Sequence, residues 1–487
     1  MNRDRERVHV APGFVPAREP RAARRERRRL LQELRAAAAA RRPARERQPR
    51  VEYLPRAGEP GPAALRSPIG LHVQAHQDTS AVWGSAYPFL AGGGLGGDGV
   101  FVGQDATSGA SFVFDPWTLY RQGRITAPNV VLAGIVGAGK SSLAKSLYLR
   151  SLAFGRRVYV PCDPKGEHTA VAEAVGGRAI QIGPGLPARL NPLDPGPRPS
   201  AVSDDEWDAQ VRARRRALLG ALAETTLGRP LSPVEHTGLD VALTATVRAA
   251  DGVPVLPAVV DLLLDPHRDD DPDRRLAEDG RPVAHALRRL VHGDLAGMFD
   301  GPSTIAFDPH LPMLSLDLSR VTENSTALSV LMTCAAAWME AALADPDGEQ
   351  RWVVYDEAWR LMSHPPLLRR MDAHWRLARH YGIANLLVFH KLSDLDNVGD
   401  AGSAARAIAT SLLANAETRV IYRQETDQIG PTAQALGLTA AETARLPFLG
   451  VGQGLWKIRN DAAVVTHQLH DLEANLFETG TRAHGNC

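Results

Sequence analysis

The sequence predicts an α/β protein built on a doubly wound, mainly parallel sheet, with an all-helical insertion and a small N-terminal region that contains β-strands. From residue 129 onward, short apolar runs alternate with helix-forming segments, as expected where helices cover both faces of a parallel sheet. Between residues 196 and 305 the chain becomes rich in Ala, Leu and Arg, with apolar residues at helical spacing. The length of 487 residues gives room for about two to four domains.

The candidate strands are short and mostly apolar throughout, which is typical of strands buried on both faces. They lie at 130–133, 158–160, 179–182, 312–318, 352–355, 385–389 and 419–422. In the insertion, the apolar spacing predicts helices at 206–228, 233–250 and 282–298. Between these helices lies an acidic loop with interleaved Pro and Arg, which predicts a solvated loop and no cation site. Its acids are Asp269, Asp270, Asp271 and Asp273.

The net charge is only +1, but residues 1–50 hold 16 arginines against 6 acids. This basic tail is either solvated and disordered, or becomes helical on contact with nucleic acid, anionic lipid or an acidic partner. Residues 51–125 contain strand-like runs at 71–73, 100–102 and 111–114, broken by Gly and Pro. The glycine cluster at 92–99 contains G-x-G-x-x-G, but no helix follows it, so we predict a loop and no dinucleotide site.

Composition predicts a cytoplasmic protein, either free or peripheral at the inner face of the membrane. No apolar run reaches the roughly 18 residues of a membrane-spanning helix, and the charged N-terminus lacks the apolar core of a signal peptide. Cys162, Cys334 and Cys487 are odd in number and lack metal-ligand spacing. This cysteine usage indicates a reducing compartment without a disulfide framework.

Residues 134–141 read Gly-Ile-Val-Gly-Ala-Gly-Lys-Ser and fit the phosphate-binding pattern G-x-x-x-x-G-K-[ST] between an apolar strand and a helix. Glycines let the backbone amides turn toward phosphate oxygens, and the helix N-terminus adds partial positive charge. Lys140 is expected to reach the β- and γ-phosphates of ATP, and the Ser141 hydroxyl to bind Mg²⁺. The predicted nucleotide-binding residues are Gly134, Gly137, Ala138, Gly139, Lys140, Ser141 and Ser142.

The run 351–357 is a candidate strand that ends in two acids, Asp356 and Glu357. Asp356 suits the Mg²⁺ shell, and Glu357 would then polarise the attacking water as a general base. A nucleotide kinase should not place a water-activating base there, so the pair favours hydrolysis. The alternative interpretation is a pair of acids that caps the following helix.

Further polar residues follow the next two strands. His390 closes the run 385–389 and would sense the γ-phosphate or orient the water; alternatively, it is a structural histidine at a sheet edge. Arg419 and Arg423 flank the last strand, and Arg376 and Arg379 precede the sensor strand. Each is a candidate for an arginine finger supplied to the next subunit of a ring. Histidine spacing predicts no metal site beyond Mg²⁺.

Over residues 88–475, the order of motifs resembles the HerA–FtsK superfamily of hexameric pumping ATPases. The motifs are the phosphate loop, Asp163-Pro-Lys165-Gly-Glu167, Asp356-Glu357-Ala-Trp359, the polar sensor and the run 418–424. Within that superfamily the chain is most similar to the cytoplasmic ATPases of conjugative transfer and type IV secretion. The resemblance implies a P-loop (RecA-like) ATPase core, with halves at 126–195 and 306–487 around the helical insertion at 196–305.

The resemblance also implies a homo-hexamer that works with secretion or conjugation channel proteins, with Arg419 or Arg423 as a finger acting in trans. Members usually have Gln where this chain has His390, and usually carry a substantial N-terminal docking domain, whereas about 125 residues precede the phosphate loop here.

We therefore expect an ATP-hydrolysing, Mg²⁺-dependent motor that energises conjugative DNA transfer or type IV secretion. One alternative is a DNA-translocating ATPase of the coupling-protein or partition type, which the Arg-rich tail would favour. Another is a nucleotide-binding assembly scaffold with negligible turnover.

Overall fold

The computed structural model separates into two units, Met1–Tyr87 and Pro88–Cys487. It describes residues 29, 32, 95–196, 198, 202–267, 271, 274–293, 295–306, 308, 310–321, 325–343, 349–358, 368–369, 371–372, 375, 378–379, 381–390 and 404–477. The predictions for the basic tail at 1–50 and for a strand at 71–73 therefore lie outside the described residues, apart from Arg29 and Gln32, which are helical and exposed.

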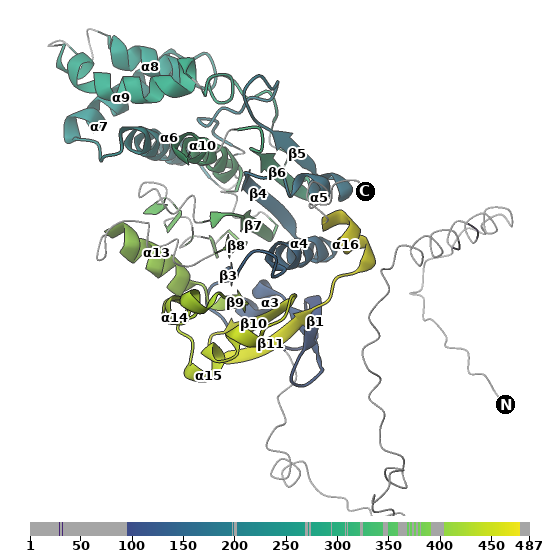
Figure 1. The fold of residues 1–487 in the computed structure, drawn as a ribbon. Coiled ribbons are helices and arrows are strands. Elements are labelled where there is room, and N and C mark those ends of the chain that lie inside the picture. The colour runs from purple at the N-terminus through teal and green to yellow at the C-terminus, as the bar shows by residue number, and fades with distance from the viewer. Residues whose placement is uncertain are drawn as a thin grey trace, which may run out of the picture. The chain divides into compact units, whose positions relative to one another are not determined.

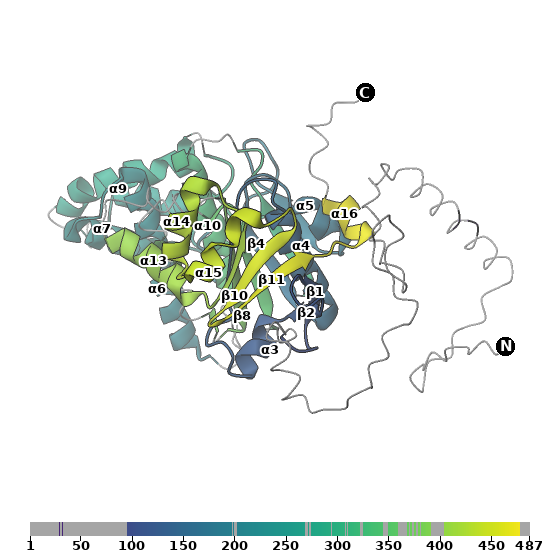
Figure 2. The same cartoon turned by 60° about the horizontal axis from the view of Figure 1, so that its bottom comes forward.

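The described part of Pro88–Cys487 is organised around an eleven-stranded sheet (Figures 1 and 2). Its strand order is β2-β1-β11-β10-β9-β3-β8-β7-β4-β6-β5. The seven strands from β9 to β5 are mutually parallel, which confirms the doubly wound, mainly parallel sheet. Their bounds are β3 (Val130–Ala133), β4 (Arg157–Asp163), β5 (Arg178–Gln181), β6 (Met313–Asp317), β7 (Arg351–Tyr355), β8 (Ile383–Phe389) and β9 (Thr418–Tyr422).

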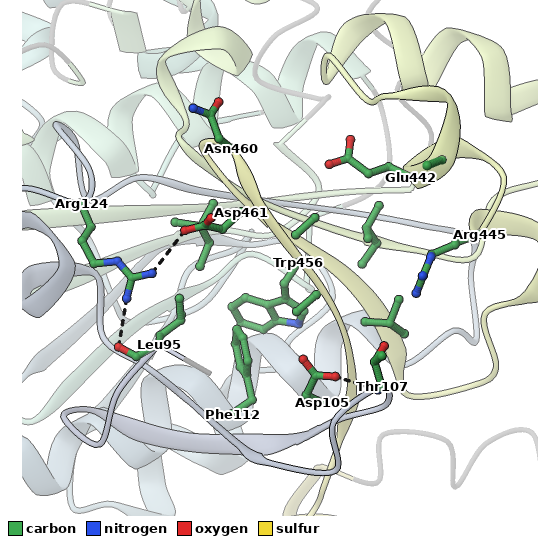
Figure 3. A pocket seen from close by; sticks show the side chains of 16 residues that line it. Leu95, Asp105, Thr107, Phe112, Arg124, Glu442, Arg445, Trp456, Asn460 and Asp461 are labelled. Atoms are coloured by element: carbon green, nitrogen blue, oxygen red, sulfur yellow. Dashed lines mark hydrogen bonds and ion pairs between the residues drawn. The ribbon is translucent and has the colours of Figure 1, made fainter. Parts of the chain in front are cut away.

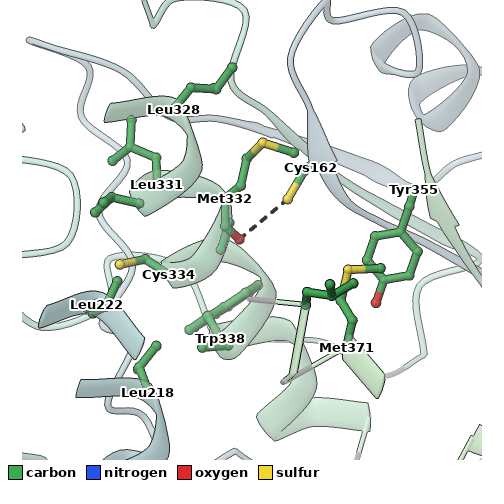
Figure 4. Close-up of a cluster of buried hydrophobic side chains, with 14 of the residues drawn as sticks. Cys162, Leu218, Leu222, Leu328, Leu331, Met332, Cys334, Trp338, Tyr355 and Met371 are labelled. Atoms are coloured by element: carbon green, nitrogen blue, oxygen red, sulfur yellow. Dashed lines mark hydrogen bonds between the residues drawn. The ribbon is translucent and has the colours of Figure 1, made fainter. Parts of the chain in front are cut away.

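Helices cover both faces of this sheet, which explains why the central strands lack an alternating pattern. On one face, α4 (Lys140–Ser151), α5 (Thr169–Ala174) and α3 (Pro116–Arg121) contribute to one apolar core. On the other, α10 (Ser325–Leu343) and α13 (Ala404–Asn415) contribute to a second core. In the second core, Cys162 of β4 donates a weak hydrogen bond to the Met332 carbonyl at 3.5 Å (Figure 4). Cys162 and Cys334 are both buried.

The insertion contains α6 (Asp204–Leu227), α7 (Pro233–Ala249), α8 (Leu256–Leu264) and α9 (Arg275–His292), and α6 packs on α10. A helix at 256–264 was not predicted. Helix α9 begins earlier than the predicted 282–298 because it continues through Pro282, and it ends earlier, at His292, before Gly293. The prediction of a solvated loop is wrong for Asp271. It is buried and accepts the backbone N–H groups of Leu276 and Ala277 in the first turn of α9.

Two antiparallel hairpins extend the sheet beyond β9. They are β1 (Val100–Asp105) with β2 (Ser111–Phe114), and β10 (Gln453–Ile458) with β11 (Asp461–His467). Because β1 pairs with β11, the described part of 51–125 belongs to the same sheet as β3, the strand that precedes the phosphate loop. The predicted domain boundaries stay a prediction. Trp456 joins the hairpins by packing on Phe112 and Phe114, each at a ring-centroid distance of 5.1 Å.

The other described helices of the C-terminal part are α14 (Thr426–Ala435), α15 (Ala440–Thr443) and α16 (Asp471–Phe477). Among the described residues, no helix has both the length and the apolar character to cross a bilayer.

Candidate functional site

The phosphate loop connects β3 to α4, where residues 134–139 link Ala133 to Lys140. Gly137 and Gly139 have φ angles of 79° and 103°, a region that side chains rarely adopt. At Gly134 the constraint is space: a Cβ atom there would lie 2.5 Å from Cβ of Tyr422 in β9. The glycines predicted from the motif are therefore required by this backbone.

Parallel pairing brings the predicted acids to the same sheet edge as the loop. Ala133 is level with Phe389 of β8, and Tyr355 of β7 is level with Leu387. The chain then leaves these strands at Gly134, His390 and Asp356. Because parallel strands end at one edge, residues distant in sequence meet there.

Lys140 lies at the start of α4 with only 3% of its surface exposed. Its Nζ donates a hydrogen bond to the Ile135 carbonyl at 2.8 Å. Burial lowers the pKa of Lys140 to about 8, although the negative charges of Asp356 and Glu357 oppose the shift. The ammonium therefore belongs to the same electrostatic cluster as the two acids.

Asp356 is buried at the end of β7, and its Oδ2 lies 3.5 Å from Nε2 of His168. Burial alone would raise the pKa of Asp356, but the nearby His168 outweighs burial and lowers it. The Nδ1 atom of His168 lies 2.9 Å from the hydroxyl of Tyr148 in α4, and both rings are buried. A polar chain therefore links the helix after the phosphate loop to Asp356.

Glu357 is buried and has a φ angle of 57°, unusual for a residue with a side chain. Its Oε1 accepts a hydrogen bond from Lys165 Nζ and lies 2.9 Å from Nε2 of His390. His390 is therefore near the predicted base, as expected for a sensor that orients the water. Burial would lower the pKa of Lys165, but the contact with Glu357 outweighs it and raises that pKa.

The motif at 163–167 begins at the last residue of β4, and the structure gives its residues a role. Asp163 accepts the backbone N–H groups of Glu167 and His168, which fixes the turn, while Lys165 reaches Glu357. Glu167 pairs at 3.5 Å with Lys145, a buried lysine of α4. Sequence reasoning noted Lys165 and Glu167 without a role, and missed His168 and Tyr148.

The candidate arginines lie in different places. Arg423 is exposed, and its carbonyl accepts the N–H of Ile135 in the phosphate loop at 3.1 Å. Arg419 is level with Val131, further back along the sheet, and its guanidinium donates to the carbonyls of Ala414, Ala416 and Leu436.

Of the second predicted pair, Arg379 lines a hollow of about 290 Å³ with residues 126–129, which precede β3. This places Arg379 at the sheet edge opposite the phosphate loop. Arg376 and Trp359 lie outside the described residues.

A different concavity, of about 640 Å³, lies beside the β10–β11 hairpin (Figure 3). Its polar lining includes Arg124, which pairs with Asp461, and Glu442, which pairs with Lys457. None of the predicted nucleotide or catalytic residues lines it.

Comparisons with known proteins extend these observations. Neither a protein-family model nor a curated protein matches the chain. The structure of VirB4 from Thermoanaerobacter pseudethanolicus is similar, with a TM-score of 0.65 and 20% identity, over 79% of this chain and 100% of that one. An unbound monoclinic form of the bacterial conjugative coupling protein TrwBdeltaN70 gives a TM-score of 0.50 and 15% identity, over 75% of this chain and 88% of that one.

At these identities the likeness concerns the fold. Together with the strand order around β3, it shows that the chain has the P-loop (RecA-like) ATPase fold.

Proposed function

We propose that this protein is an Mg²⁺-dependent ATPase that energises conjugative DNA transfer or type IV secretion. The observation that carries the proposal is the meeting of Lys140, Asp356, Glu357 and His390 at one sheet edge, around a glycine-rich phosphate loop. Similarity of fold to VirB4 and to the conjugative coupling protein TrwBdeltaN70 supports the transport role.

The residues present fit a bound nucleotide and its metal ion. Gly137 and Gly139 leave a cradle without Cβ atoms, and α4 begins at that cradle. The Ser141 hydroxyl and the Asp356 carboxylate are hard oxygen donors, the type that Mg²⁺ prefers. When bound, Mg²⁺ would neutralise phosphate charge, and these two residues would hold its shell.

Each protein group then has a defined task in hydrolysis of the β–γ phosphoanhydride. Lys140 exchanges the Ile135 carbonyl for phosphate oxygens and supplies positive charge. Glu357 accepts a proton from the attacking water, while Lys165 and His390 hold its carboxylate in place.

The quaternary and cellular parts of the proposal come from the sequence resemblance. We propose a homo-hexamer that works with channel proteins at the inner face of the membrane. We assign Arg423 as the finger because it is exposed and can reach another subunit, whereas the Arg419 guanidinium is held by three backbone carbonyls of its own chain. The Arg-rich tail at 1–50 favours the alternative of a translocase that contacts DNA directly.

Steady-state ATP hydrolysis with Mg²⁺, measured with and without single- and double-stranded DNA, tests the proposal. The Glu357→Gln variant is the blank, because Gln keeps the size of the side chain and cannot act as the base. Turnover that exceeds the blank and ignores DNA supports a secretion motor. Strong stimulation by DNA would favour the translocase, and turnover equal to the blank would favour the scaffold.

A further inference from the structure

The segment 446–452 lies against the phosphate loop, although it precedes β10 and is far from the loop in sequence. The Gly452 N–H donates to the Ala138 carbonyl at 2.9 Å. A Cβ atom on Gly139 would lie 3.4 Å from the Gly452 nitrogen. The end of this segment is therefore part of the wall of the proposed nucleotide site.

Sheet topology fixes the side of the site on which the segment lies. Strand β10 is antiparallel to β9, and Gly454 is level with Tyr422 at the end of β9. The start of β10 therefore lies at the same sheet edge as the phosphate loop. Strands β9 and β10 flank β3 on one side, whereas β8 and β7, which carry His390 and the acids, lie on the other.

This arrangement gives a direction to a bound nucleoside triphosphate. Its terminal phosphate must face Glu357, since that residue is the proposed base, and therefore points toward β7 and β8. The base is at the other end of the molecule and extends toward β9 and β10. From that side, the segment 446–452 reaches the phosphate loop together with Tyr422 and Arg423 at the end of β9.

The segment carries large exposed apolar side chains within four residues of Gly452, which contacts the phosphate loop. Phe448 is 85% exposed and Val451 is 79% exposed, while Val136 at the tip of the phosphate loop is 77% exposed. Leu446 and Leu449 are buried and anchor the segment in the core. Exposed apolar side chains on an anchored loop beside a polar site are typical of a ligand contact.

We propose that segment 446–452 is the platform for the nucleotide base, with Phe448 stacking on the base and Val451 and Val136 completing an apolar rim. This inference rests on the proposed function. The segment reads Leu-Pro-Phe-Leu-Gly-Val-Gly, so none of its side chains can donate or accept a hydrogen bond. Stacking accepts any base, and the site therefore binds ATP and GTP with similar affinity.

The test measures binding by titration calorimetry with Mg²⁺, using the full chain with Glu357→Gln to prevent turnover. The ligands are ATP, GTP and inorganic tripolyphosphate, which has the phosphates but no base. Adding Phe448→Ala should weaken ATP and GTP binding about 5- to 160-fold, because stacking of a base on an aromatic ring is worth that factor. Tripolyphosphate affinity should not change.

Phe154→Ala is the matched control, since Phe154 is also an exposed phenylalanine, 54% exposed, in the short helix Leu152–Phe154 after α4. It should leave all three affinities unchanged. Equal losses of ATP and tripolyphosphate affinity in Phe448→Ala, or no loss at all, would overturn the platform. So would a change only in oligomeric state, measured by light scattering, because Phe448 would then serve a contact between copies. If neither ATP nor tripolyphosphate bound the chain that carries only Glu357→Gln, the proposed function itself would be refuted.

Discussion

Replacing Arg419 tests whether this arginine has a structural role, in contrast to Arg423, the proposed finger. The Arg419 guanidinium donates to three backbone carbonyls, two of them at the C-terminal end of α13. These are the carbonyls that a helix end leaves without partners. Arg419→Met keeps much of the apolar volume, removes all three bonds and leaves the carbonyls to find water.

The expected cost follows from the geometry. Three bonds from a half-buried charged donor are worth about 3 kcal/mol in total. For a unit the size of Pro88–Cys487, an unfolding entropy of about 2.1 cal/mol/K per residue makes 1 kcal/mol equal to about 1 °C. We therefore expect Arg419→Met to lower the melting temperature by about 3–4 °C in scanning calorimetry and to leave kcat within about twofold.

Arg423→Met is the matched variant, because Arg423 is exposed at the other end of the same strand. Its melting temperature should stay within about 1 °C of the parent. If Arg423 is the finger, kcat should fall by about 1000-fold or more. An Arg419→Met variant that kept the parent melting temperature and lost hydrolysis would contradict the structural role of Arg419.

Three further predictions concern other parts of the structure. Gly220→Ala should raise the melting temperature by about 1 °C, because α6 gains up to about 1 kcal/mol of helix propensity and the new methyl meets only a His236 carbon at 4.0 Å; a lower melting temperature would contradict this. Lys165→Met should lower kcat about tenfold at unchanged KM for ATP, since Lys165 contacts Glu357 and not the phosphate loop; steady-state kinetics that show only a KM change would contradict it. The hydrogen bond from Arg229 lowers the pKa of Glu235 from 4.5 to about 2, so its stabilisation is complete above pH 4.5 and is lost as the pH falls toward 2. Urea unfolding should show Glu235→Gln less stable than the parent at pH 7, and this difference should shrink as the pH falls through 2.

Most of the sheet could be predicted because its central strands are buried on both faces and read as apolar runs. The hairpin of β10 and β11 could not, since its strands include polar residues such as Lys457 and Thr466, and their partners were unknown. Helix α8 has nine residues, too few for a clear periodicity.

The site residues likewise include some that local sequence predicts and some that it does not. The phosphate loop and the two acids are local motifs, each recognisable within a few residues. The contact of Lys165 with Glu357 spans 192 residues and exists because β4 pairs with β7, a strand order that local sequence does not specify. Arg419 and Arg423 look equivalent in sequence, and only the packing of α13 and α14 around β9 distinguishes them.

The backbone at Glu357 offers an independent argument that this residue is functional. Among the described residues, Arg274, Glu357 and Arg459 have positive φ angles without being glycine. Arg274 precedes α9 and Arg459 lies in the β10–β11 turn, both exposed positions where this conformation is common. Glu357 is buried, and a glycine there would relieve about 1 kcal/mol of strain. The chain instead keeps a carboxylate in the strained position, where it meets Lys165 and His390. The sequence motif independently predicts Glu357 as the base. The chemistry of its carboxylate therefore best explains why the backbone strain at Glu357 persists.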